Sequence, residues 1–372
     1  MPELTPNIGA FISIKKGDIQ FVLETLRAAD YTLVGPTIDD GVIIYDEIEK
    51  MDDLPIGWTD HQEPASYRLQ RREDDAFFGY VVGPHSWKKY LFPPRQTLLK
   101  VEKNNGSFTV IDDHEPAPRY AFIGVRGCEL QAIHIQDRIF LGGDYQNPHY
   151  KARRQQVFVL AVNCTEPGGT CFCASMGSGP QVGQGFDLAL TELDDIFIVE
   201  VGSEVGATMM RETQWRPAGA FELQQARDAL ATAKKNMGRQ LDTSDLPNLL
   251  YQNLEHPHWR EVADRCLSCA NCTMVCPTCF CNDVLDVSDL SGTHLERVRV
   301  WDSCFSIEFS HVHGGNIRPH VSSRYRQWLT HKFASWIDQF GVIGCVGCGR
   351  CITWCPAGID ITEEINAIRG EV

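Results

Sequence analysis

The chain of 372 residues has no long apolar run and no recognisable leader segment. No window reaches the length of uninterrupted apolar sequence that a membrane-spanning helix needs. Residues 1–16 lack the charged region, apolar core and cleavage site that together mark a signal peptide. These absences argue against a membrane-embedded or secreted protein, and we expect a soluble one.

An excess of positive charge is also missing, and so are the short motifs of several enzyme classes. The net charge is −15, whereas a nucleic-acid-binding surface needs a basic footprint. There is no GxGxxG after a predicted strand, no P-loop, no nucleophile elbow and no HExxH. We therefore predict no catalytic residue in this chain, no obvious substrate-converting site, and neither nucleic acid nor membrane as a partner.

Cysteine is abundant instead, and its spacing is informative. The chain has 15 cysteines, which indicates a reducing compartment and hence predicts the cytoplasm. Eight of them form two runs with the same x2-x2-x3 spacing, each followed by a proline: Cys266, Cys269, Cys272 and Cys276, then Cys345, Cys348, Cys351 and Cys355. This spacing, used twice, is the ligand pattern of bacterial ferredoxins that bind two 4Fe–4S clusters.

In that pattern three cysteines of a run surround one cluster, and the fourth reaches the other cluster. We therefore assign the first cluster to Cys266, Cys269, Cys272 and Cys355. The second cluster takes Cys345, Cys348, Cys351 and Cys276. Zinc sites commonly use two CxxC pairs rather than this run. Disulfides would suit a small secreted domain, which this chain is not.

Four further cysteines follow predicted strands in the amino-terminal part. Cys128 comes after a strand predicted at 120–125, Cys164 comes after one at 157–162, and Cys171 and Cys173 form a CxC shortly beyond. A helix predicted at 129–140 lies between the two strands, and this β–α–β order predicts a parallel pair. Because loops after parallel strands converge at one edge of a sheet, the four thiols can meet there. We predict a third metal site, preferring an iron–sulfur cluster to zinc, with buried free cysteines as the alternative.

The remaining cysteines, Cys279, Cys281 and Cys304, are interpreted as buried structural residues. Cys279 or Cys281 is the substitute ligand if Cys276 does not reach the second cluster. His311 and His313 form a His-x-His pair. Such a pair can bind a metal, but a hydrogen-bonded structural histidine is more common.

The overall pattern predicts an α+β fold. A mixed α/β domain is expected at 1–255, and a mainly helical ferredoxin-like domain with two 4Fe–4S clusters at 256–372. The second domain carries a helical insertion at 282–344 between its two cysteine runs. Hydrophobic periodicity further predicts helices at 18–29 and 221–237, and strands at 31–34, 42–45, 77–82 and 196–201.

Within the insertion, residues 322–340 predict an amphipathic helix that stops at Gly341. One face carries large apolar side chains: Tyr325, Trp328, Leu329, Trp336, Ile337 and Phe340. We interpret this stripe as core packed over the clusters, in preference to an electron relay through the tryptophans. Covering the clusters would exclude water and tune their reduction potentials.

Several longer motifs resemble one family. In the carboxy-terminal part these are CLSCANCTMVCPTCFC at 266–281, WDSC at 301–304, HGG at 313–315, SRYRQWLTH at 323–331 and GCVGCGRCITWCP at 344–356. In the amino-terminal part they are IGWTD at 56–60, GPHSWKK at 83–89, GVR at 124–126 and CFCASMG at 171–177. The chain resembles the iron–sulfur beta subunit of soluble NAD(P)-linked nickel–iron hydrogenases, or sulfhydrogenases. The iron–sulfur electron-transfer subunit of anaerobic sulfite reductase is similar in kind.

That resemblance implies a heterotetramer. A flavin subunit exchanges a hydride with NAD(P)H, the beta subunit passes single electrons on, and a nickel–iron large subunit with a small iron–sulfur subunit interconverts protons and hydrogen. In the sulfite-reductase relatives the terminal partner is a siroheme subunit instead. The eight motif cysteines carry over as cluster ligands. Gly127 stands where the family pattern suggests proline and Glu129 where it suggests aspartate, so the geometry of that loop can differ.

We therefore expect an electron-transfer subunit that works between a nickel–iron hydrogenase module and a flavin NAD(P)H-oxidoreductase subunit. The first alternative is the same role in an anaerobic, siroheme-containing sulfite reductase. A third hypothesis is a stand-alone iron–sulfur redox sensor, although a sensor needs only one cluster. The identity of the neighbouring subunits separates these three.

Overall fold

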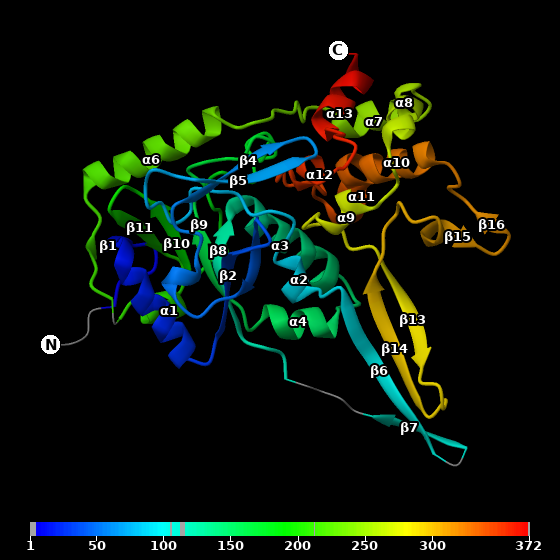
Figure 1. Cartoon of the computed structure of the whole chain (residues 1–372), viewed down its shortest axis with the longest axis horizontal. Helices are drawn as coiled ribbons and strands as arrows, with labels where there is room; N and C mark the ends of the chain where they lie inside the picture. Colours follow the sequence, from blue (N-terminus) through cyan, green and yellow to red (C-terminus); the bar gives the residue numbers. More distant parts are fainter. Residues whose placement is uncertain (1–4, 105, 112–115, 212, 371–372) are drawn as a thin grey trace.

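The computed structural model describes residues 5–104, 106–111, 116–211 and 213–370. Its amino-terminal half is built around a large sheet, and its carboxy-terminal half gathers short helices at the other end of the molecule (Figure 1). An arm of long strands projects from the junction between the two. The fold is therefore of the mixed α and β type that the sequence predicts.

In the described part of the chain, the large sheet has eight strands in the order β12-β1-β11-β10-β9-β8-β2-β3. Their bounds are β1 (Phe11–Lys15), β2 (Thr32–Asp39), β3 (Val42–Glu47), β8 (Tyr120–Arg126), β9 (Phe158–Val162), β10 (Leu188–Glu192), β11 (Ile196–Val201) and β12 (Arg216–Pro217). Strands β2, β8, β9 and β10 run parallel, and the outer strands join antiparallel. The predicted parallel pair of β8 and β9 is thus confirmed, with Phe122 opposite Val159.

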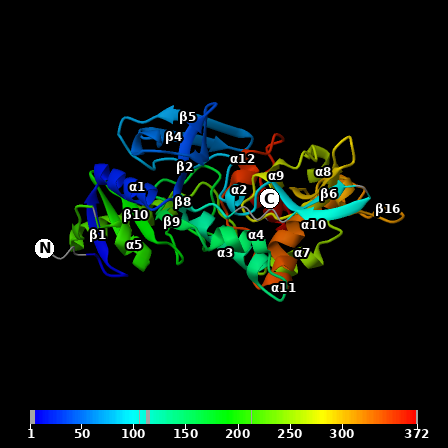
Figure 2. The same cartoon turned by 90° about the horizontal axis from the view of Figure 1, so that it is seen from below.

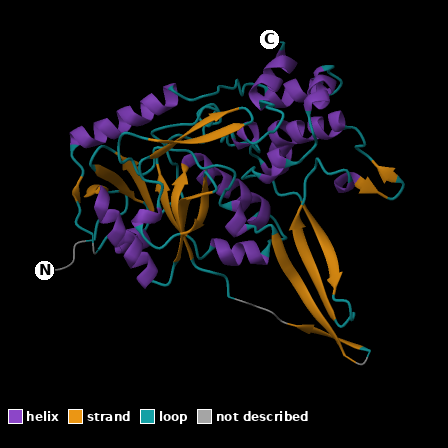
Figure 3. Ribbon diagram, in the orientation of Figure 1, coloured by secondary structure: helices purple, strands orange, loops and turns teal. Residues whose placement is uncertain are grey.

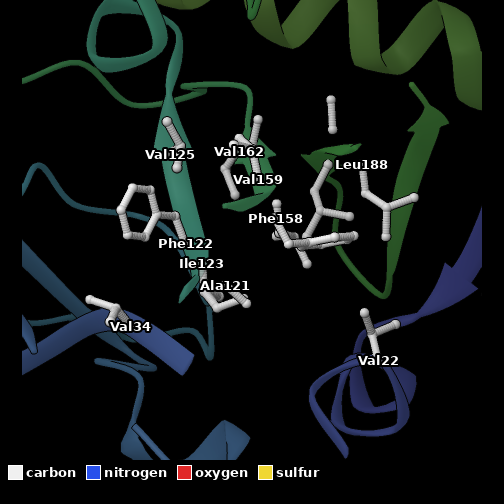
Figure 4. Close-up of a cluster of buried hydrophobic side chains, with 14 of the residues drawn as sticks. Val22, Val34, Ala121, Phe122, Ile123, Val125, Phe158, Val159, Val162 and Leu188 are labelled. Carbon is white, nitrogen blue, oxygen red and sulfur yellow. The ribbon is translucent and has the colours of Figure 1, made fainter. Parts of the chain in front are cut away.

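The centre of this sheet is apolar on both faces. All residues of β9 are buried, and so are Ala121 to Arg126 of β8. Figure 4 shows Phe122, Val159 and Leu188 packed with neighbouring aliphatic side chains. Central parallel strands need such cover because helices or loops lie on both faces. The carboxyl ends of β8 and β9 are thereby fixed side by side in a rigid core.

Helices and a hairpin cover the sheet. They are α1 (Ile19–Ala28), α3 (Gly127–Leu141), α4 (Pro148–Arg154), α5 (Glu204–Met209), α6 (Ala220–Lys235) and the hairpin of β4 (Trp58–Glu63) and β5 (Ser66–Arg71). Figure 2 shows β4–β5 and α3 on opposite sides of β8 and β9. The predicted helices at 18–29, 129–140 and 221–237 are confirmed as α1, α3 and α6. The predicted strand at 77–82 is wrong: the segment has no strand pairing, although Phe78 and Tyr80 are buried.

The helices of the carboxy-terminal half are α7 (Leu246–Gln252), α8 (His258–Arg265), α9 (Asn271–Met274), α10 (Val321–Thr330), α11 (Trp336–Phe340), α12 (Arg350–Thr353) and α13 (Ile361–Arg369). They share a second apolar core that contains Trp259, Trp328 and Ile365. Leu246 and Leu250 of α7 belong to this core although they precede residue 255. The domain boundary at 255 stays a prediction. Within the described residues, no helix combines the length and apolarity needed to cross a membrane.

The insertion at 282–344 is not wholly helical, which corrects the prediction. It begins with the hairpin of β13 (Asn282–Ser288) and β14 (His294–Trp301), and β14 pairs with β6 (Arg95–Asn104) of the amino-terminal half. With β7 (Ser107–Ile111) these strands form the four-stranded arm seen in orange in Figure 3. The short strands β15 (His311–Val312) and β16 (Gly315–Asn316) follow. Strand pairing with a distant segment is invisible to periodicity within the insertion.

The predicted amphipathic helix at 322–340 exists, but it is interrupted. A π-helical segment, His331–Ser335, separates α10 from α11, and Gly341 ends α11 in the left-handed conformation at φ 70°. Because this segment changes the helical register, the apolar stripe divides. Tyr325 and Trp328 pack in the second core, whereas Trp336 packs against Val346.

Candidate metal centres

The first cysteine run forms a tight loop between two helices. Helix α8 ends at Arg265, so Cys266 opens the loop, and Cys272 lies in α9. Ser268 and Ala270 have positive φ angles of 51° and 68°, which are uncommon for residues with a side chain. The backbone N–H of Ser268 lies 3.4 Å from Cys266 Sγ. The loop therefore turns its thiols and an amide donor toward one centre.

That centre is a small pocket. It is lined by the predicted ligands of the first cluster, Cys266, Cys269, Cys272 and Cys355. Phe305, Tyr325 and Trp328 close it from the apolar side. Burial raises the pKa of Cys272 well above its usual value, and the neighbouring thiols of Cys266, Cys355 and Cys269 raise it further. Such thiols ionise together only when positive charge binds among them, and the iron of a cluster supplies that charge. The site fits a 4Fe–4S cluster.

The second cysteine run lies on a turn that leads into α12. Gly347 and Gly349 have φ angles of 65° and 75°, which glycine adopts without strain. The N–H of Gly347 lies 3.4 Å from Cys345 Sγ. Burial raises the pKa of Cys351, and Cys345, Cys348 and Cys276 raise it further. The structure thus brings Cys276 close to the second run, and the exchanged ligand assignment stays a prediction.

A buried lysine lies beside Cys276. Lys332 is 3% exposed, and its Nζ lies 3.4 Å from Cys276 Sγ and 3.5 Å from Cys279 Sγ. Burial lowers the pKa of Lys332, but the thiolates of Cys276, Cys279 and Cys345 outweigh burial and raise it well above the usual value. The positive charge of the Lys332 ammonium therefore compensates the negative charge of ionised cysteine sulfur at the second centre.

The three cysteines interpreted as structural also lie near this centre. Cys279 makes a hydrogen bond to Cys276, and this bond lowers the pKa of Cys276. Cys304 makes one to Cys281, which lowers the pKa of Cys281 to about 7. Cys279 and Cys304 are buried, whereas Cys281 is half-buried. His311 and His313, in contrast, are exposed on the β15–β16 hairpin.

The four amino-terminal cysteines meet as predicted from the strand ends. One small cavity is lined by Cys128, Cys164, Cys171 and Cys173. Cys128 lies in the first turn of α3, directly after β8. Cys164 follows β9 and is buried, as are Cys171 and Cys173. Cys348 of the second run and the side chains of Arg126 and Arg350 complete the lining. Four thiols with cations beside them fit a metal cluster, although its presence stays a prediction.

This cavity and the second cysteine run are joined through their backbones. The N–H of Phe172 donates to the carbonyl of Gly347 at 2.8 Å, and Ser178 Oγ donates to the carbonyl of Val346 at 2.6 Å. A Cβ on Gly347 would lie 2.7 Å from the backbone nitrogen of Cys173. Only glycine permits this approach, so the two thiol groups are held at a fixed separation.

A buried ion pair bridges the same two groups. Arg350, between Cys348 and Cys351, pairs with Glu129, the neighbour of Cys128. Their side chains are 4% and 1% exposed, respectively. Glu129 also accepts hydrogen bonds from Trp87 Nε1 at 3.0 Å and from the Tyr45 hydroxyl. Burial lowers the pKa of Arg350, but Glu129 and Cys348 outweigh this effect and raise it.

Arg126 supplies a second buried charge. It is 6% exposed, and its guanidinium donates to the carbonyl oxygens of Phe78 at 2.7 Å and Tyr80 at 2.9 Å. This contact explains why the misassigned segment at 77–82 is irregular, since its carbonyls turn toward the site. Burial raises the pKa of Cys164, and Arg126 counteracts it.

Sequence reasoning missed the roles of Arg126, Glu129, Arg350 and Lys332. Arg350 stands inside the second cysteine run and Glu129 adjoins Cys128, so their positions in the sequence already indicated that they lie near the thiols. Lys332 gave no such signal, because it is distant in sequence from the cysteines it contacts. Among the described residues, no three His, Cys, Asp or Glu side chains are arranged to hold a single metal ion. A 4Fe–4S cluster does not require that arrangement, because each cysteine binds a different iron.

Comparison with known proteins assigns the carboxy-terminal site to a class. Residues 265–359 match the family model described as a 4Fe-4S dicluster domain. Taken with the cysteine geometry, this match defines an iron–sulfur protein of the electron-transfer type.

The chain is similar, more specifically, to the "Sulfhydrogenase 2 subunit beta" of Pyrococcus furiosus. The two are 29% identical over 338 residues, which are 90% of this chain and 91% of the relative. The resemblance to a hydrogenase beta subunit that the motifs indicated is therefore confirmed over nearly the whole length. No solved structure matches the chain.

Proposed function

We propose that this chain is the electron-transfer subunit of an NAD(P)-linked nickel–iron hydrogenase. It would work between a flavin NAD(P)H-oxidoreductase subunit, on one side, and a hydrogenase module made of a nickel–iron large subunit with a small iron–sulfur subunit, on the other. The observation that carries this proposal is the convergence of two x2-x2-x3 cysteine runs in a protein similar to a sulfhydrogenase beta subunit. When bound, 4Fe–4S clusters accept and release single electrons.

The proposed ligand sets are supported by the thiols that lie near one another. The first set is Cys266, Cys269, Cys272 and Cys355, which share one cavity. The second set is Cys345, Cys348, Cys351 and Cys276, which influence one another's ionisation. A third set is Cys128, Cys164, Cys171 and Cys173. We propose an iron–sulfur cluster there rather than zinc, because a cluster requires no convergence on a single ion.

The three sets form a continuous series. Cys272 of the first set lies in α9, and Cys276 of the second follows shortly after that helix ends at Met274. Cys272 also influences the ionisation of Cys351. Cys348 of the second set lines the cavity of the third set. The second set therefore lies between the other two. This order suits a relay in which the first and third sets are reached from different partner subunits.

Iron and inorganic sulfide analysis of the anaerobically prepared full chain tests the cofactor content. Three clusters predict about twelve irons per chain, and two predict about eight. Cys171→Ser should lower a count of about twelve to about eight and leave the EPR signals of the other clusters in place. A wild-type count of eight would remove the third cluster from the proposal. Zinc, or iron without sulfide, at the two cysteine runs would refute the relay.

Purification of the native complex tests the partners. The proposal expects a flavoprotein and a nickel-containing subunit to co-purify with this chain. A siroheme subunit in place of the nickel subunit would instead assign the chain to a sulfite reductase. Isolation of the chain alone from a native extract would contradict both and favour a redox sensor.

A further inference from the structure

The π-helical segment between α10 and α11 places one cation inside the protein. Such segments are rare and occur frequently at functional sites. Here the segment is His331–Ser335, and it directs Lys332 toward the cysteine loops, with Phe333 and Ala334 also buried. Burial of a lysine is unfavourable unless its ammonium finds acceptors or an opposite charge. The contacts of the Lys332 ammonium therefore identify the acceptors and charges that offset its burial.

The ammonium of Lys332 has four acceptors, and two of them are sulfur atoms. Its Nζ lies 3.4 Å from Cys276 Sγ and 3.5 Å from Cys279 Sγ. It also lies 3.2 Å from Thr278 Oγ1 and 3.2 Å from the carbonyl oxygen of Gly344. An ammonium only donates hydrogen bonds, so every contact is of the correct polarity.

The backbone of Lys332 holds the other side of the same centre. Its carbonyl accepts a hydrogen bond from the N–H of Gly344 at 2.8 Å, and Gly344 directly precedes Cys345. Thr278 Oγ1 donates to the Gly344 carbonyl at 2.7 Å. Lys332 therefore connects the loop that carries Cys276 with the loop that carries Cys345. These two cysteines come from different runs of the sequence, and Lys332 lies where the two runs meet.

We propose that Lys332 is a positioning residue that donates a hydrogen bond to the Cys276 thiolate and raises the reduction potential of the second cluster. This inference rests on the proposed ligand role of Cys276. A positive charge and a hydrogen bond to ligand sulfur both stabilise the more negative, reduced form of a cluster. The side chain of Lys332 supplies the positive charge, and its backbone carbonyl supplies the hydrogen bond to Gly344. Substitution of the side chain therefore removes the charge and leaves the backbone contact in place.

Lys88 (in α2, Lys88–Leu91) offers a matched control. It is 4% exposed and approaches the same segment, donating to the carbonyls of Cys279 at 3.2 Å and Met274 at 3.5 Å. Its ammonium also lies 3.9 Å from the centre of the Trp301 ring. Lys88 is thus a lysine of similar burial, but its hydrogen bonds go to backbone oxygen rather than to sulfur, and burial lowers its pKa.

The test is an EPR-monitored redox titration of the anaerobic full chain in four forms: wild type, Lys332→Met, Lys332→Arg and Lys88→Met. Lys332→Met should make reduction of one cluster at least tenfold less favourable, which is about 59 mV for one electron. Lys332→Arg keeps the charge and should restore most of the potential. Lys88→Met should produce a smaller shift. Iron content is measured in every form.

Distinct results would overturn the inference. An unchanged potential in Lys332→Met, or equal shifts in the Lys332→Met and Lys88→Met variants, would mean that the hydrogen bond to sulfur has no special role. Loss of four irons in Lys332→Met that Lys332→Arg restores would support a requirement for the charge, whereas loss in both variants would assign a purely structural role. If the wild-type chain itself lacks a second cluster, the proposed function fails instead, independently of Lys332.

Discussion

Replacement of Glu129 by glutamine is the sharpest test of the buried charges in this protein. The side chain of Glu129 is 1% exposed and forms an ion pair with Arg350, which is 4% exposed. Glutamine keeps nearly the same shape and keeps an oxygen that can accept from Trp87 Nε1. The substitution therefore removes one negative charge and leaves the guanidinium of Arg350 buried without its counter-charge.

The expected cost is large. Removing one partner of a buried ion pair destabilises a protein by about 3–5 kcal/mol, because the other charge stays desolvated. In domains of 150–250 residues each kcal/mol lowers the Tm by about 2–4 °C. Since this chain is longer, the smaller of these values applies, and Glu129→Gln should lower the Tm by about 6–10 °C. Ionised Cys348 beside Arg350 supplies other negative charge, so the cost in the iron-loaded protein should lie toward the lower end of this range.

The assay is anaerobic thermal unfolding of the iron-loaded full chain, followed by near-ultraviolet circular dichroism. Arg350→Met and the double variant complete a double-mutant cycle. The double variant should be less destabilised than the sum of the single variants, because no charge is then left unpaired. Asp286→Asn, which breaks an exposed ion pair with Arg297 in the arm, serves as control and should leave the Tm unchanged. A Glu129→Gln protein within 2 °C of wild type (about 1 kcal/mol), or strictly additive variants, would refute the reasoning.

Three further substitutions test other parts of the structure. Cys276→Ser should alter the EPR signal of the cluster held by the second cysteine run, and a change confined to the first cluster would contradict the exchanged ligands. Gly347→Ala should lower both Tm and iron content, because its Cβ would meet the Cys173 backbone at 2.7 Å; Gly292→Ala, with a similar φ and nothing within 4 Å, should lower neither by as much. Leu329→Ala should destabilise the second core by about 2–5 kcal/mol in denaturant unfolding, and an effect below 1 kcal/mol would show that the core has collapsed around the gap.

The local elements of the fold were predictable because short-range patterns specify them. Helix α1 alternates apolar and polar residues with helical spacing, strand β9 is apolar throughout, and strand β8 is mainly apolar up to Arg126. The arm was not predictable in the same way. Strand β14 pairs with β6, nearly two hundred residues earlier, and no periodicity within β14 reveals its partner. The segment at 77–82 has the composition of a strand, but its carbonyls bind Arg126 instead of a neighbouring strand.

The thiols of the candidate site were predictable, whereas most of their surroundings were not. Repeated spacing identified the two runs, and the rule that parallel strands end at one edge brought Cys128 and Cys164 together. No rule of that kind locates a buried cation. Lys332 reaches Cys276 because a π-helical turn shifts the register of an otherwise amphipathic helix. A regular helix over 322–340 would have directed its apolar stripe to one side, which is what the sequence predicts.

The buried cations are distributed unevenly among the three thiol groups, and this distribution affects the reduction potentials expected for clusters bound there. No lysine or arginine lines the first cavity among the described residues, where Arg324 donates to the Ser268 hydroxyl rather than to sulfur. The second group has Lys332 against Cys276, and the third has Arg126 and Arg350 in its lining. Because fixed positive charge favours the reduced form of a nearby cluster, we expect the first cluster of the proposed relay to be harder to reduce than the second. At the third group Glu129 offsets the charge of Arg350, which leaves Arg126 to act in the same way if a cluster is bound there.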